Sequence, residues 1–281
     1  MTYLAASMTY RDEAPYLREW IEFHRIVGVE RFFLYDTGST DEHEQILAPY
    51  VERGIVTVEK WPGEARQNEA IDHCLTAHAD VRWIAFIDAD EFLFSARGRP
   101  VPELLERYEE FPGLGVNLAQ YGTSGHDTKP EGLVIENYLY RSTNPEIRWV
   151  KNIVQPARTT GCRGAHVFEF DTGHAVDVEK RPLDGWLSET YVQSRLRINH
   201  YYTKSLEELR AKFAKTRADT GELRPALDVP RLRRLEARFT RDEKILRYLP
   251  ELKQRLAAGA EAVDGPVQGG HVDTSAGVLP E

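Results

Sequence analysis

The first half of the chain alternates short apolar runs with amphipathic segments. The pattern predicts strands at 3–8, 31–35, 55–59 and 83–87. Between them it predicts three helices, the first from Asp12 or a neighbouring N-cap to Val27 and the others at 42–53 and 64–78. Because nearly continuous apolar strands joined by helices favour a parallel sheet covered on both faces, residues 1–95 are predicted to be α/β and Rossmann-like in layout.

The second half shows a different pattern of apolar and polar positions, with shorter strand-like runs. These lie at 114–119, 133–141, 149–155, 165–170 and 195–202, and helices are predicted at 206–217 and around 232–256. The tail 257–281 is rich in Gly, Ala and Val with few large apolar residues, which predicts disorder. We therefore expect a single domain over 1–256, divided into 1–95, an irregular β-rich part at 96–217 and C-terminal helices at 218–256.

Composition narrows the class of protein. The 281 residues carry a net charge of −9, which argues against nucleic-acid binding because such proteins usually gather positive charge on one face. Cys74 and Cys162 have no metal-type spacing and suggest no disulfide framework, as in a reducing compartment. No basic leader and no run of about 20 apolar residues is present. We expect a cytoplasmic protein, either free or peripheral at the inner membrane face.

Polar side chains follow each predicted strand of the first half, where ligands bind in parallel α/β sheets. Asp88 and Asp90 come directly after the apolar run 83–87. In extended backbone both point to one side, so together they can hold a hard divalent cation that neutralises a diphosphate. The alternative is that Asp88 caps a turn while Asp90 and Glu91 are solvated.

The other strand-end loops offer further binding groups. Asp12 lies after the first strand, and Asp36 after the second could accept hydrogen bonds from a base or ribose. The segment 39–41 is explained equally well by capping of the next helix. Arg66 and the adjacent Gln67 could meet a phosphate or carboxylate, although Arg66 could also be a solvated first-turn arginine.

Taken together, these segments resemble glycosyltransferase family 92 and the neighbouring bacterial family-2-like enzymes of GT-A fold. The loop DTGSTD at 36–41 matches a signature of family 2 and its relatives. Four further segments carry the narrower resemblance: REWIEFH at 18–24, WIAFIDADEF at 83–92, YGTSGH at 121–126 and NHYYTKS at 199–205. The resemblance spans about 1–217 and makes 1–95 the nucleotide-binding half and 96–217 the acceptor and metal-completing half.

The resemblance implies a metal-dependent transfer of a sugar from a UDP-sugar to a saccharide acceptor, with Mn²⁺ or Mg²⁺ as cofactor. It suggests galactose as the sugar and inversion at the anomeric carbon. Asp36 would contact the uridine part, and His200 would join Asp88 and Asp90 on the metal. Lys204 would hold the departing phosphate. A packed histidine and a solvated lysine are the alternatives for His200 and Lys204.

An inverting transfer needs a base for the acceptor hydroxyl. Asp127, next to His126, is the first candidate because its loop could approach the donor, although it could be an ordinary turn residue. The reserve candidates are Glu91, Glu136 and Asp171. His126, Lys151 and His166 are expected to line the acceptor side.

Two departures from the resembled family matter. Thr37 stands where an acidic residue or Asn is usual, which affects the expected base or ribose contact. Animal and plant members are generally membrane-anchored, whereas this sequence shows no anchor, so a secretory location does not carry over.

Three other classes of protein share single features with this sequence. A phosphatase of haloacid-dehalogenase type has its Asp-x-Asp early in the chain, whereas here the motif follows the fourth predicted strand. A dinucleotide-dependent dehydrogenase has a Gly-rich turn after its first strand, whereas residues 8–15 of this sequence contain no glycine. A non-catalytic carbohydrate-binding protein that stacks sugars on tryptophans remains the alternative of a different class. It would not need the Asp88 and Asp90 pair.

Overall fold

The computed structural model describes residues 1–63, 65–215 and 221–263. Position 64, the predicted helix end around 217 and the tail from 264 onward lie outside the described residues. Within the described ranges no helix is both long enough and apolar enough to cross a bilayer.

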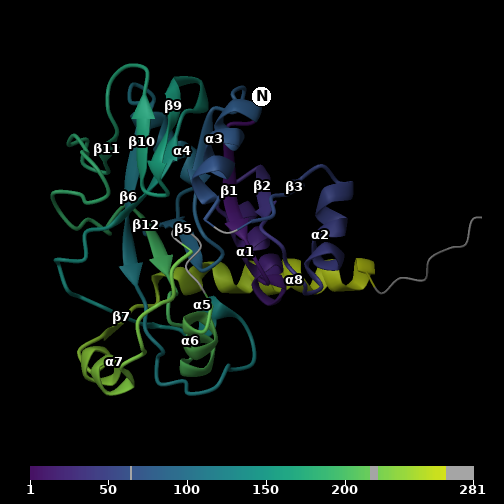
Figure 1. The fold of residues 1–281 in the computed structure, drawn as a ribbon, viewed down its shortest axis with the longest axis vertical. Helices are drawn as coiled ribbons and strands as arrows, with labels where there is room; N and C mark the ends of the chain where they lie inside the picture. Colours follow the sequence, from purple (N-terminus) through teal and green to yellow (C-terminus); the bar gives the residue numbers. More distant parts are fainter. Residues whose placement is uncertain (64, 216–220, 264–281) are drawn as a thin grey trace, which may run out of the picture.

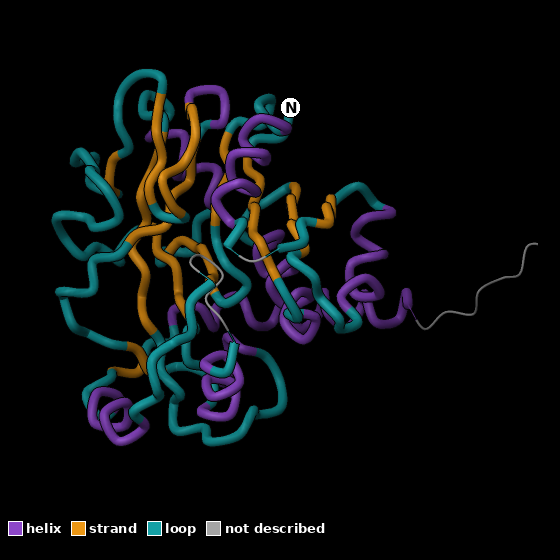
Figure 2. The backbone as a smooth tube through the Cα atoms, in the orientation of Figure 1, coloured by secondary structure: helices purple, strands orange, loops and turns teal. Residues whose placement is uncertain are grey.

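One mixed sheet runs through the molecule (Figures 1 and 2). Its strand order is β3-β2-β1-β4-β8-β6-β12-β5, with β11 beside β6. The strands are β1 (Leu4–Tyr10), β2 (Arg31–Asp36), β3 (Val56–Lys60), β4 (Trp83–Phe86), β5 (Glu91–Ser95), β6 (Gly113–Gln120), β8 (Val150–Val154), β11 (Val176–Asp177) and β12 (Leu196–His200). The predicted α/β class is confirmed.

Strand direction brings many loops to one edge of the sheet. Strands β3, β2, β1 and β4 are parallel neighbours. Strand β8 is antiparallel to both β4 and β6, so β6 points the same way as β4, and β12 is parallel to β6. The carboxyl ends of β1, β2, β4, β6 and β12 therefore share an edge, where β8 and β5 begin.

Helices cover the sheet and lie at its ends. They are α1 (Ala14–Ile26), α2 (His43–Glu52), α3 (Gln67–Ala77), α4 (Val101–Leu105), α5 (Val134–Asn137), α6 (Leu206–Phe213), α7 (Val229–Glu236) and α8 (Leu249–Val263), with 3₁₀ turns at Glu106–Tyr108, Pro156–Arg158 and Lys244–Tyr248. In α1 the apolar spacing buries Leu17, Trp20 and Ile21 completely. The Trp20 indole also donates to the Glu91 carbonyl at 2.9 Å, which fixes β5 against α1.

Two short two-stranded sheets lie outside the main one. Strand β9 (Thr159–Gly164) pairs with β10 (Val167–Phe170), and β7 (Tyr140–Arg141) pairs with β13 (Thr240–Arg241). Neither β9 nor β5 was predicted as a strand.

The prediction of a strand at 133–141 is wrong over most of its length. Residues 134–137 form the helical turn α5, because the backbone N–H groups of Val134 and Ile135 donate to the buried Glu19 carboxylate at 2.8 and 3.0 Å. Burial raises the pKa of Glu19 to about 7, and those two hydrogen bonds oppose the rise. A carboxylate from α1 thus satisfies the exposed donors of this turn.

The prediction of one helix at 232–256 is also wrong. Helix α7 ends at Glu236, strand β13 follows, and α8 begins at Leu249. The interruption centres on Asp242, which accepts hydrogen bonds from two arginines of other elements. Helix α8 continues to Val263, past the predicted end at residue 256, and packs on α1.

Candidate active site

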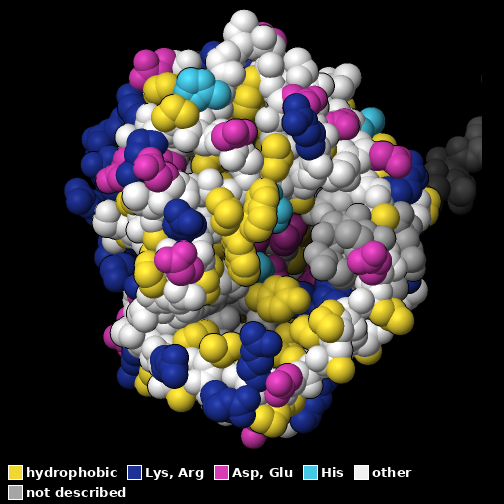
Figure 3. Space-filling model, turned by 60° about the vertical axis from the view of Figure 1, so that its left-hand side comes forward, with side chains coloured by type: hydrophobic (Ala, Val, Ile, Leu, Met, Phe, Trp, Pro, Cys, Tyr) yellow, Lys and Arg dark blue, Asp and Glu magenta, His cyan; other side chains and the backbone are white. Residues whose placement is uncertain are grey.

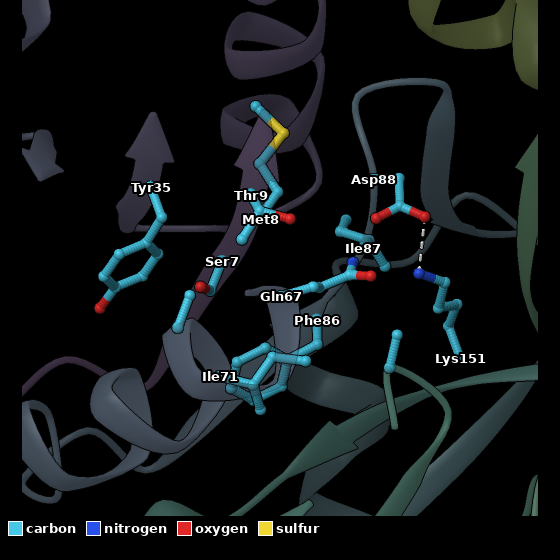
Figure 4. A pocket seen from close by; sticks show the side chains of 12 residues that line it. Ser7, Met8, Thr9, Tyr35, Gln67, Ile71, Phe86, Ile87, Asp88 and Lys151 are labelled. Atoms are coloured by element: carbon cyan, nitrogen blue, oxygen red, sulfur yellow. Dashed lines mark hydrogen bonds and ion pairs between the residues drawn. The ribbon is translucent and has the colours of Figure 1, made fainter. Parts of the chain in front are cut away.

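Two carboxylates occupy the turn between β4 and β5, at the shared edge of the sheet. The Asp88 Oδ2 atom lies 2.7 Å from the Lys151 ammonium nitrogen, and the Asp90 Oδ2 atom lies 2.7 Å from that of Lys212 (Figure 4 shows the first pair). The Asp88 side chain is 39% exposed and that of Asp90 is 13% exposed. Asp90 is thus the inner member of the pair and Asp88 the one open to a ligand.

Glu91 lies in the same cluster, at 0% exposure. Its Oε2 atom accepts the Asp88 backbone N–H at 2.9 Å and lies 3.5 Å from the Lys151 nitrogen. Its Oε1 atom has no hydrogen-bond partner among the described residues and lies 3.9 Å from His200 Nε2. Burial raises the Glu91 pKa to about 7, although the charge of Lys151 opposes this. The alternative in which Glu91 is solvated is therefore wrong.

His200 ends β12 and faces Asp90. Its Nε2 atom is 3.5 Å from Asp90 Oδ1, and its Nδ1 atom is 2.9 Å from the Gln120 side-chain amide nitrogen. If the Gln120 amide presents its oxygen instead, Nδ1 carries the proton and the Nε2 lone pair becomes free to bind a cation.

The side chains around Asp90 are chemically suited to a divalent cation. Two carboxylates and an imidazole are ligands that Mn²⁺ accepts, and the orphaned Oε1 atom of Glu91 lies beside the imidazole. As they stand, no three His, Cys, Asp or Glu side chains of the described residues are arranged to hold a metal ion. The ammonium groups of Lys151 and Lys212 each contact one carboxylate oxygen, the Oδ2 atom, so a cation that takes that oxygen competes with the lysine.

Two further lysines approach the cluster, Lys204 from the loop between β12 and α6 and Lys212 from α6. Lys204 is buried, with its nitrogen 3.3 Å from the Tyr16 ring centroid and 3.9 Å from Glu13. Burial lowers the Lys204 pKa, and the charge of Glu13 opposes this. Lys212 also contacts the Tyr202 ring, at 3.9 Å from its centroid. Burial would lower the pKa of Lys212, but Asp90 outweighs burial and raises it.

Sequence reasoning missed Lys212. The available signal was its place about two helical turns beyond Lys204, on a predicted helix that follows the histidine strand. That spacing alone does not separate a lysine that pairs with an active-site carboxylate from one that faces solvent.

The loops after β1 and β2 are joined to each other. Asp12 has a left-handed backbone, with φ 56°, and its Oδ1 atom accepts the Thr40 N–H at 2.9 Å. This hydrogen bond lowers the pKa of Asp12, although burial opposes it. Asp36 Oδ1 accepts the N–H groups of Ser39 and Gly38 at 2.8 and 3.1 Å. Burial would raise the pKa of Asp36, but these bonds outweigh it and lower the value.

Both acids therefore shape the loops in which they lie. One oxygen of Asp36 is committed to its own turn, and the other lies 3.6 Å from His43 Nε2. Thr37 donates its hydroxyl to the Tyr10 carbonyl rather than facing a ligand.

Gln67 and Arg66 point in different directions. Gln67 lines a small pocket with Ser7, Asp88 and Lys151, and extends toward the Asp88–Lys151 pair (Figure 4). Arg66 instead pairs with Glu69 at 2.7 Å and stacks over Trp61. The structure thus brings Gln67 to Asp88 and leaves Arg66 engaged elsewhere.

Of the three residues predicted to line the acceptor side, His166 and Lys151 lie near the carboxylate cluster and His126 does not. His166 is near Lys151, Asp88 and His200, whose charges act on it, and its Nδ1 atom lies 2.7 Å from the Val150 carbonyl oxygen. Burial lowers the His166 pKa, and the charge of Lys151 lowers it further. Lys151 belongs to the cluster itself, as the partner of Asp88 and Glu91.

His126 and Asp127 lie in the loop after β6. The His126 ring packs edge-on against Tyr138. Asp127 is 74% exposed and forms an ion pair with Arg233 of α7. Its carbonyl accepts the Glu207 N–H at the start of α6, whereas Lys212 lies near the end of that helix. The described contacts do not bring Asp127 to the carboxylates.

One face of the molecule is hollowed near its centre, where acidic and histidine side chains are visible between hydrophobic ones (Figure 3). The carboxylates, the histidine and the lysines described above form a single cluster of charged groups. The family model of glycosyltransferase family 92 matches residues 5–227. The chain belongs to glycosyltransferase family 92. This confirms the resemblance that the sequence motifs indicated.

The family 92 chain is 35% identical over 209 residues to a glycosyltransferase family 92 protein of Oryza sativa subsp. japonica. The matched region covers 73% of this chain and 34% of the rice protein. It is 31% identical over 117 residues to a galactan beta-1,4-galactosyltransferase of Arabidopsis thaliana, covering 37% of this chain and 22% of that protein. The chain spans about a third of the length of the family 92 relatives that it matches.

Among solved structures, this family 92 chain is similar to S. aureus TarS 1–349 in complex with UDP-GlcNAc. The match covers 56% of this chain and 46% of that one, with a TM-score of 0.39 and 12% identity.

Proposed function

We propose that this chain is a nucleotide-sugar glycosyltransferase of GT-A type that moves a hexose from a UDP-linked donor to a saccharide acceptor, with inversion. The observation that carries the proposal is the pairing of Asp88 with Lys151 and of Asp90 with Lys212 at the carboxyl edge of the sheet, in a chain of glycosyltransferase family 92. The similarity to a galactan galactosyltransferase makes UDP-galactose the first donor to test.

In this proposal the donor lies across the ends of β1, β2 and β4. The joined loops of Asp12 and Asp36 receive the uridine part, and Gln67 reaches the donor from α3. The diphosphate lies beside Asp88, where Lys151, Lys204 and Lys212 supply positive charge. Such charge stabilises the leaving diphosphate as the glycosidic bond to it breaks.

Asp88, Asp90 and His200 would hold a divalent cation, Mn²⁺ or Mg²⁺. When bound, the cation neutralises the negative charge that develops on the leaving diphosphate. His200 would be held for this role by Gln120, whose amide lies 2.9 Å from the second ring nitrogen.

The acceptor would approach from the side of His166, with Lys151 between the acceptor and the buried carboxylates. Asp127 remains our candidate for the base that takes the proton of the attacking hydroxyl. To act there, Asp127 must leave Arg233 and its loop must move toward the donor.

A screen of UDP-sugars, with and without Mn²⁺, tests the proposal through UDP release and transfer to oligosaccharides. We expect metal-dependent turnover, fastest with UDP-galactose, and its loss in the Asp90→Asn variant. The variant should keep its far-ultraviolet circular dichroism, because it keeps the shape of the side chain. A wild-type protein that binds oligosaccharides but no UDP, with or without Mn²⁺, would show a carbohydrate-binding protein instead.

A further inference from the structure

Each carboxylate of the proposed metal pair already has an internal cation. The Lys151 nitrogen lies 2.7 Å from Asp88 Oδ2, and the Lys212 nitrogen lies 2.7 Å from Asp90 Oδ2. Each pair joins a largely buried group to a more exposed one: Lys151 is 3% and Asp88 39% exposed, and Asp90 is 13% and Lys212 30% exposed. The buried member screens each pair partly from solvent, while the exposed member leaves it open to exchange.

The lysines come from other parts of the chain than the carboxylates. Lys151 is the second residue of β8, 63 positions from Asp88, and Lys212 lies in α6, 122 positions from Asp90. Lys212 has further contacts, since it donates to the Tyr202 carbonyl at 3.3 Å and lies over the Tyr202 ring. It therefore has a place near the cluster even when Asp90 is taken by another cation.

We propose that Lys151 and Lys212 act as a charge exchange, in which they compete with a divalent cation for Asp88 and Asp90 and, once displaced, bind the diphosphate of the donor. The inference rests on the proposed function and adds to it a mechanism of coupling. Cation and nucleotide each bind weakly alone and strengthen each other.

The charges of the cluster explain the sign of this coupling. A cation that binds alone must displace ammonium groups from carboxylates and leave them uncompensated beside its own positive charge. A diphosphate that binds alone meets lysines still held by carboxylates. When both bind, each displaced lysine gains a phosphate oxygen, so each ligand removes the cost that the other meets. Because linkage is reciprocal, the two enhancements must be equal.

Titration calorimetry of the full chain tests the proposal with Mn²⁺ and UDP as probes. In the wild type, saturating UDP should tighten Mn²⁺ binding by the same factor as saturating Mn²⁺ tightens UDP binding, within the range of about 5- to 150-fold usual for coupled sites. In Lys212→Met the competitor at Asp90 is gone, while Lys151 remains. Mn²⁺ should bind the nucleotide-free variant more tightly than wild type, and UDP should bind the Mn²⁺-saturated variant more weakly.

Tighter Mn²⁺ binding together with weaker UDP binding would distinguish a lysine that exchanges partners from one that only supports the fold. A lysine that only supports the fold would weaken both affinities together when removed, and that result would overturn the proposal, as would two unchanged affinities. Lys180→Met is the matched control, because its nitrogen is also 2.8 Å from a carboxylate, that of Glu110, on the exposed surface. It should change neither affinity.

Two further arms keep the test decisive. Lys212→Gln also removes the charge and serves, with the same expected changes, if the methionine variant does not fold, whereas Lys212→Arg keeps the charge and should keep the competition with Mn²⁺. Failure of the proposed function has a different signature, namely that wild-type protein binds no UDP at all. The nucleotide-free Mn²⁺ titration still decides the competition in that case, since an unchanged affinity in Lys212→Met refutes it.

Discussion

Replacing Asp242 with Asn should destabilise the fold through one buried ion pair. Asp242 is 6% exposed and accepts a hydrogen bond from each terminal nitrogen of the Arg197 guanidinium, at 2.9 and 3.0 Å. It also accepts from Arg141 at 2.8 Å and from the Lys244 backbone N–H at 3.1 Å. Arg197 is 0% exposed, so Asp242→Asn leaves a buried guanidinium without its counter-charge.

The expected loss is about 3–5 kcal/mol, the usual cost of leaving one member of a buried pair uncompensated. For 281 residues the entropy of unfolding is about 0.6 kcal/mol/K, at about 2.1 cal/mol/K per residue. The loss therefore corresponds to a fall in Tm of about 5–8 °C. Urea titration and calorimetry measure these two quantities independently.

The pH dependence gives a second, sharper measurement. Burial alone would raise the pKa of Asp242, but the hydrogen bonds from Arg197 hold it well below its usual range. A carboxyl group whose pKa is depressed by folding contributes stability above its unfolded-state pKa of about 3.9, and loses it as the pH falls toward the folded-state pKa. The wild-type advantage over Asp242→Asn should be constant from about pH 5 to 8 and narrow below about pH 4.

Glu103→Gln is the control, because Glu103 pairs with Arg99 at 3.0 Å on the exposed surface, where both side chains are nearly half exposed. It should cost less than about 1 kcal/mol. A loss below about 1 kcal/mol for Asp242→Asn, or a difference from wild type that does not narrow in acid, would refute the reasoning.

Two further predictions concern His24 and Asp127. His24 is fully buried, its Nε2 accepts the Leu93 N–H at 3.1 Å, and burial lowers its pKa to about 3. Since the unfolded state binds that proton from about pH 6.5 downward, stability should fall with acid, by at most about 1.4 kcal/mol per pH unit. In urea titrations His24→Gln should flatten this slope, and an unchanged slope would assign it to other groups. If Asp127 is the base, Asp127→Asn should lower kcat for transfer at least about 100-fold while UDP affinity stays constant. Turnover within twofold of wild type would make Asp127 a turn residue.

The positions of Asp88, Asp90 and Asp36 could be predicted because the rule that locates them is local. An apolar run followed by an acid marks the end of a buried strand, and parallel strands end at one edge. The structure places these acids at strand ends and shows the two predicted strand neighbours β1 and β2 in parallel register. Their ligands remain predictions.

Contacts between distant parts of the chain limit how much of the structure could be predicted from the sequence. Val134 and Ile135 read as strand, yet Glu19, 115 and 116 positions earlier, holds them in a helical turn. Arg197 and Asp242, 45 positions apart, divide what periodicity shows as one helix. In each case a buried charge overrides local propensity, because leaving it unpaired costs more than a turn of helix contributes.

The charged groups of the proposed active site are also far apart in the sequence. Its carboxylates come from the first half of the chain, while the cations that contact them come from β8 and α6 in the second half. A change that shifts α6 or the start of β8 therefore alters the charge at Asp88 and Asp90 without touching the nucleotide-binding half. If the acceptor binds near His166 and Lys151, as we propose, it acts on the group that neutralises Asp88. Acceptor and donor binding would then be coupled through Lys151, and not only through the geometry of the transfer.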